Sequence, residues 1–177
     1  MTATHSPAAT DLDVASFIED RVAEHALLAG ARLGRLRELA CEAAEANADI
    51  AELAQMDHRI ACFCNDLAEC CRREEHMVFP TLLRLRSQTH ITSCKAGMVA
   101  ARLRFMVAEQ QALLSALADV IGMVERNLSP AGPCESCHQL LHEAKAFVSD
   151  LAAHVRREQD ELFAWGVSRE AVLVQSK

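Results

Sequence analysis

Apolar residues recur at steps of three and four along most of the chain, which is the spacing of one face of an α-helix. Four long segments show this pattern: about 13–47, 49–86, 94–126 and 134–165. The stretch NLSPAGPC at 127–134 is the clearest turn between them. Long amphipathic segments with brief connections are typical of antiparallel neighbours. The pattern therefore predicts an all-α, up-down-up-down four-helix bundle.

Composition agrees with a single helical domain. The chain has 177 residues, of which 51% are hydrophobic, and it contains six Gly, four Pro and no Tyr. Ala, Leu, Glu and Arg are abundant and are strong helix formers, whereas a sheet would need more β-branched and aromatic residues. We expect the bundle over 13–166, between a flexible N-terminal segment (1–12) and a C-terminal tail (167–177) with room for one more helical turn.

Charge and termini narrow the function classes. The formal net charge is −7 and no basic block is present, which argues against a nucleic-acid partner. The N-terminus lacks the basic start and apolar run of a signal peptide, and no stretch approaches about 18 uninterrupted apolar residues. These features predict a cytoplasmic protein with no membrane contact, as a monomer or homodimer. The eight cysteines are then expected to be thiols or metal ligands rather than a disulfide framework.

The second half of the chain repeats the first. LAECCRREEHMVF at 67–79 matches LAAHVRREQDELF at 151–163, and VAEHALL at 22–28 matches VAEQQAL at 107–113 in its first three residues. A helical hairpin therefore appears twice, which predicts pseudo-twofold symmetry. Under this pairing the corresponding positions are His25 and Gln110, Cys70 and His154, and Glu74 and Glu158.

Polar residues interrupt the inward-facing stripe of each predicted helix near its middle. In the fourth helix they are His154 and Glu158, whose side chains share one face because they lie four residues apart. A buried carboxylate costs several kcal/mol or more unless it is paired or binds a metal. Two readings follow: the imidazoles and carboxylates bind a cation, or they satisfy one another in a metal-free cluster.

These motifs resemble the hemerythrin-like family of HHE cation-binding domains, particularly the di-iron proteins implicated in repair of iron-sulfur centres. The counterparts here are AEH ending at His25, CCRREEHMVFP around Glu74, AEQ ending at Gln110, and HVRREQDELF around His154. The GPCESCHQLL approach to the fourth helix also resembles the repair subgroup. The resemblance covers nearly the whole chain after about residue 14. It implies non-haem iron and a role in oxygen, nitric oxide or iron handling, or in stress-linked repair.

The resemblance also implies a ligand set. In the family, histidines of the first and fourth helices serve one iron, those of the second and third serve the other, and two glutamates bridge them. Here one position keeps two histidines, whereas its neighbour would rely on Cys70 and Gln110, and an amide offers only a weak neutral oxygen. The predicted metal residues are His25, Glu74, His154, Glu158 and Cys70.

Two imidazoles and two carboxylates suit divalent iron, manganese or zinc. The resemblance selects iron among these metals, so we expect an iron protein with one or two ions, one being favoured, and zinc or manganese as alternatives. It also implies a small diatomic ligand such as O2 or NO. Hydrolytic catalysis has no support, because no set of nucleophile, base and orienting group is recognisable. The competing hypothesis is a metal-free helical interaction protein that has lost the site.

Overall fold

The computed structural model describes residues 12–127 and 135–175, and every regular element in these ranges is helical. The α-helices are α1 (Val14–Leu28), α2 (Ala31–Ala46), α3 (Ala51–Ala54), α4 (Met56–Arg73), α5 (Phe79–Ser87), α6 (Met98–Asn127), α7 (Glu135–Arg157) and α8 (Ala164–Gln175). Two π-helices, η1 (Glu74–Val78) and η3 (Glu158–Phe163), and one 3-10 turn, η2 (Ser93–Lys95), lie between them. The predicted all-α class is confirmed. Residues 1–11 of the predicted flexible segment, and most of the predicted turn, lie outside the described residues.

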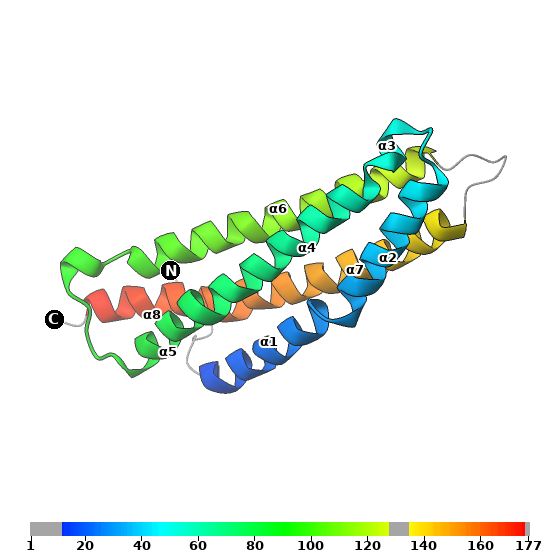
Figure 1. Ribbon diagram of the computed structural model, residues 1–177. Coiled ribbons are helices and arrows are strands. Elements are labelled where there is room, and N and C mark those ends of the chain that lie inside the picture. The colour runs from blue at the N-terminus through cyan, green and yellow to red at the C-terminus, as the bar shows by residue number, and fades with distance from the viewer. Residues whose placement is uncertain (1–11, 128–134, 176–177) are drawn as a thin grey trace, which may run out of the picture.

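The helices form an antiparallel bundle (Figure 1). At one end α2 packs against α4 and α7, and α6 packs against the same two helices, so the four rods close a ring. At the other end α1 lies beside α5, and α8 lies beside α5 and α6. The chain runs along the bundle and back twice, which confirms the predicted up-down-up-down arrangement.

The first predicted helix is interrupted. The helix α1 begins after Asp13, whose carboxylate accepts a hydrogen bond from the amide of Ala15 at 3.2 Å, and it ends at Leu28. A Cβ at Gly30 would lie 2.8 Å from the carbonyl oxygen of Ala26, so this turn needs glycine. Prediction of one helix over 13–47 was wrong, because glycine allows the chain to change direction here. The break gives α1 a different tilt from α2, and His25 lies in the last turn of α1 (Figure 1).

The second and fourth rods each contain a π-helix. In the second, the amide of Phe79 donates to the carbonyl of Glu74, five residues earlier. Pro80 follows and has no amide hydrogen, yet the helix continues to Ser87. The wider turn explains why this rod does not end at the proline. The fourth rod runs beyond the predicted end at residue 165, because α8 continues it for three turns to Gln175.

The helix α6 is long and apolar enough to cross a membrane, judged by length and composition alone. Core helices of globular proteins meet the same criterion. Here α6 lies between α4 and α7 and buries Leu103, Met106 and Leu117. Its place in the bundle therefore accounts for the apolar residues on its buried face.

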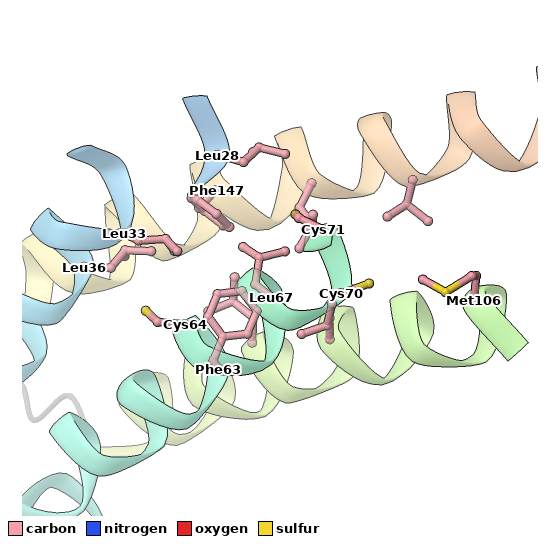
Figure 2. Packing of buried hydrophobic residues seen from close by; sticks show 14 of the residues in the cluster. Leu28, Leu33, Leu36, Phe63, Cys64, Leu67, Cys70, Cys71, Met106 and Phe147 are labelled. Atoms are coloured by element: carbon pink, nitrogen blue, oxygen red, sulfur yellow. The ribbon is translucent and has the colours of Figure 1, made fainter. Parts of the chain in front are cut away.

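The hydrophobic core runs through the bundle, and one part of it fills the ring of α2, α4, α6 and α7 (Figure 2). Phe63 and Phe147 meet edge to face at its centre, with 5.9 Å between ring centroids. Leu36 and Leu67 pack around them. This apolar half of the bundle leads directly to the buried polar residues on α1, η1, α6, α7 and η3.

Candidate metal centre

Five buried polar residues converge where the two π-helices begin. They are His25 of α1, Glu74 of η1, Gln110 of α6, His154 of α7 and Glu158 of η3. Each glutamate is the first residue of its π-helix and follows an Arg-Arg pair. The repeated sequence therefore folds into the same local structure twice, and π-helical turns are frequent at functional sites.

The donor atoms of this cluster face one another. His25 Nε2 lies 3.1 Å from Glu74 Oε2 and 3.9 Å from Glu158 Oε1, and His154 Nε2 lies 3.6 Å from Glu158 Oε1. Ligand atoms of His25, His154 and Glu158 all lie within 4.8 Å of one another. Among the described residues, three buried side-chain atoms make no hydrogen bond: Arg21 Nε, His25 Nε2 and Glu158 Oε1. The last two have charged neighbours only at ion-pair distance. Buried polar atoms are rarely left so, and a cation between them would satisfy both.

Two outer carboxylates fix the orientation of the imidazoles. Glu75 Oε1 lies 2.9 Å from His25 Nδ1, and Glu24 Oε2 lies 2.7 Å from His154 Nδ1. In the tautomer that carries its proton on Nδ1, each imidazole would donate to its carboxylate and direct the Nε2 lone pair at the centre, as a bound metal requires. This carboxylate-imidazole arrangement is the usual support for a metal-binding histidine.

A buried arginine supports one of these carboxylates. Arg21 is 1% exposed, and its guanidinium donates to Glu24 Oε1 while NH1 lies 3.4 Å from His154 Nδ1. The guanidinium carbon also lies 5.0 Å from the centroid of the Phe17 ring. The pattern of the sequence did not identify Arg21 or Glu75, because isolated charged residues on a helix usually face solvent.

The shifts in pKa differ among the inner residues. Burial would lower the pKa of His25, but Glu74 and Glu75 outweigh it and the net shift is upward. Burial lowers the pKa of His154, and the opposing effect of Glu24 is too small to reverse this. Burial, reinforced by the charge of Glu74, raises the pKa of Glu158 well above its ordinary value. Without a cation the interior therefore disfavours the charge on Glu158.

Gln110 connects the two inner carboxylates. Its Nε2 donates to Glu74 Oε1 at 2.8 Å and to Glu158 Oε2 at 2.7 Å, while its Oε1 accepts from Gln159 Nε2 at 2.8 Å. These partners determine the amide orientation, because the carboxylates are acceptors and the Gln159 amide nitrogen is a donor. The amide thus uses both of its hydrogens to hold the carboxylates.

The two adjacent cysteines lie on different sides of the helix (Figure 2). Cys70 Sγ lies 3.8 Å from Glu74 Oε1, to which it donates, whereas Cys71 forms a possible ligand group with His25 and Glu74. Burial raises the pKa of both thiols, to about 12 for Cys71, with further contributions from Glu74. Both thiols are therefore protonated unless a metal binds them. Ligation by Cys70 stays a prediction, and Cys71 is a candidate that the sequence did not indicate.

The fold and this cluster define a helical-bundle protein with a candidate cation-binding centre. A comparison with family models matches residues 12–165 to the hemerythrin HHE cation-binding domain. The chain therefore belongs to the hemerythrin HHE family, whose domains bind a non-haem metal. Comparisons with curated proteins and with solved structures found no match.

Proposed function

We propose that this protein binds a single iron ion through His25, Glu74, His154 and Glu158. The observation that carries the proposal is a pair of buried atoms, His25 Nε2 and Glu158 Oε1, that make no hydrogen bond and lie 3.9 Å apart. Anchoring of both Nδ1 atoms by outer carboxylates supports it, because a metal-free cluster has no need for two aligned Nε2 lone pairs.

Gln110 favours one ion over two. Its amide donates to both inner carboxylates and uses one oxygen of each. The other two oxygens, Glu74 Oε2 and Glu158 Oε1, are those that face His25 Nε2. One divalent ion also balances the two negative charges, so a second ion would require additional anions. Zinc and manganese suit the same donors.

A very small cavity borders the centre. It encloses about 10 Å³ and is lined mainly by apolar side chains, among them Leu28, Leu67 and Leu151, together with Glu74 and His154. This space is at the lower limit for one water molecule, which argues against an organic substrate. The expectation of a diatomic ligand rests on the family resemblance. When bound, iron would supply an open coordination position and redox chemistry for O2 or NO.

The protein's residues would control access and charge at this position. The apolar lining limits entry of water, while the outer carboxylates hold the two imidazoles in place. We place this chemistry in oxygen, nitric oxide or iron handling, with stress-linked repair of iron-sulfur centres as the more specific role. The Cys-x-x-Cys-His approach to α7 and the repeated motifs support that role by resemblance.

Metal analysis tests the proposal. Protein loaded anaerobically with ferrous iron and desalted should contain about one ion per chain, because the donors describe one site. The variant His154→Ala should lose the ion, whereas His142→Ala, an exposed histidine on the same helix, should retain it. A wild-type protein without metal after loading would favour the interaction-protein hypothesis.

Two further measurements address the role. Ferrous wild-type protein should change its visible spectrum on addition of NO, and His154→Ala should not. The loaded protein should also restore activity to an enzyme with an oxidatively damaged iron-sulfur centre. If the protein binds metal but neither responds to NO nor repairs the enzyme, the metal site is supported and the proposed role is refuted.

A further inference from the structure

A second cavity lies at the end of the bundle where α5 ends, α6 begins and α8 ends (Figure 1). It encloses about 350 Å³, a volume in the range of small-molecule sites. None of the proposed metal ligands lines it. The lining comes from α5, the segment 88–95, the first two turns of α6, and Glu170 of α8.

Three cationic side chains line this cavity: Arg84, Lys95 and Arg102. Within residues 12–127 and 135–175, none of them has a carboxylate at ion-pair distance. The chain as a whole carries a formal charge of −7, whereas the charged side chains at this cavity are mainly positive. This local excess of positive charge attracts anions.

Two of these cations meet at one hydroxyl group. Arg102 NH1 lies 2.7 Å from Thr81 Oγ1, and Arg84 NH2 lies 3.4 Å from the same oxygen. The hydroxyl itself lies 2.6 Å from the carbonyl oxygen of Met77, to which it donates. Both guanidinium groups therefore lie close together although like charges repel. An oxyanion would offset this repulsion and accept hydrogen bonds from both groups.

Glu170 carries the one carboxylate among the described lining residues, and it does not neutralise the two arginines. Glu170 is 3% exposed, and its two oxygens accept from the amides of Val99 and Ala100 at 3.0 and 2.9 Å. It thus caps the N-terminus of α6 and offsets the positive end of that helix. The side-chain cations stay available to a ligand.

The rest of the lining is mixed, with the polar residues Gln88, His90 and Thr92 beside an apolar part. Leu85 is buried, Ile91 and Val99 are partly buried against the core, and Met98 is 58% exposed at the edge of the cavity. A cationic group next to an apolar surface fits a ligand that has both characters. We propose that this cavity binds a small amphipathic oxyanion, namely a phosphate monoester or carboxylate attached to a short apolar body.

Calorimetric titration of the full chain at low salt tests this proposal, with octyl phosphate as the probe. Octyl phosphate should bind with one-to-one stoichiometry. Inorganic phosphate, which lacks the apolar body, and octyl glucoside, which lacks the charge, should each bind at least about tenfold more weakly, because each forfeits one class of contact. Octanoate in a parallel titration shows whether the phosphate or the carboxylate head is preferred, and tight binding of either supports the proposal.

Matched variants place the probe in the cavity. Arg84→Met and Arg102→Met keep most of the aliphatic side chain and should each weaken binding at least about tenfold, since each removes a charge-assisted hydrogen bond. Arg86→Met is the control, because Arg86 lies on the same helix but does not line the cavity. Circular dichroism checks that all variants fold. Absence of octyl phosphate and octanoate binding, or equal losses in the Arg84 and Arg86 variants, would overturn the proposal.

Discussion

Replacement of Glu158 by glutamine should raise the stability of the metal-free protein and lower its affinity for iron. Glu158 is 0% exposed, its Oε2 accepts from Gln110, and its Oε1 has no partner. The substitution Glu158→Gln can retain the acceptor oxygen facing Gln110 and places an amide donor beside the Nε2 atoms of His25 and His154. It therefore removes a buried charge and satisfies an unpartnered position at nearly constant volume.

The expected magnitude follows from that unpartnered atom. An unsatisfied buried polar group costs about 1–3 kcal/mol. Without metal, the free energy of unfolding of the variant should therefore exceed that of the wild type by about that amount. For a chain of this size each kcal/mol corresponds to about 2–4 °C in the melting temperature. In the presence of ferrous iron the variant should bind at least about 100-fold more weakly, a loss of about 2.7 kcal/mol.

The pH dependence gives a second check on the same residue. Because the pKa of Glu158 is raised in the folded state, its protonated form stabilises the metal-free wild type at low pH, and this contribution is lost as pH rises through the raised value. The advantage of Glu158→Gln should therefore be absent at acidic pH and grow towards neutral pH.

Thermal unfolding after chelator treatment, followed by circular dichroism, measures both effects. The control is Glu161→Gln, which removes an exposed carboxylate paired with Arg157 on the preceding turn. It should change neither the free energy of unfolding nor the affinity for iron appreciably. A Glu158→Gln protein that is less stable than wild type without metal at neutral pH, or that still binds iron as tightly, would refute the reasoning.

Three further predictions concern the same centre. Glu24→Gln should weaken iron binding by about 10–100-fold with little loss of fold, measured by competition with a chelator, because His154 would lose the carboxylate at its Nδ1. The double variant Cys70→His/Gln110→His should raise the metal content from one ion per chain to two, measured by elemental analysis, because it copies His154 and His25 into their symmetry-related positions. The increase in melting temperature on adding metal should grow with pH, because the ion requires Glu158 without its proton; an increase that falls with pH would contradict this.

Much of the bundle could be predicted because helical periodicity reports directly on burial. The inward stripes placed His154 and Glu158 on one face, and the repeat indicated Glu74 as the partner of Glu158; the structure brings all three together with His25. That these residues bind a metal stays a prediction. Spacing placed His154 and Glu158, since side chains four residues apart must share a helix face. The family resemblance added His25 to the ligand set.

The errors have local physical causes. A step of three or four residues continues across Gly30, so periodicity did not reveal that the chain turns there. The apolar pattern also did not reveal the π-helical turns at Glu74–Val78 and Glu158–Phe163. Arg21 and Glu75 act through contacts between helices, and such contacts depend on tilt, which the sequence pattern does not specify.

The difference between the two halves of the repeat explains how one centre can arise from a symmetric core. The glutamates are the same in both halves, so two carboxylates meet in the middle. Imidazoles occur at only two of the four related positions, and both of these, His25 and His154, direct Nε2 to the same side. On the opposite side Gln110 donates two hydrogens to the same carboxylates. Because a neutral amide holds them without adding charge, a single divalent ion suffices to neutralise the cluster.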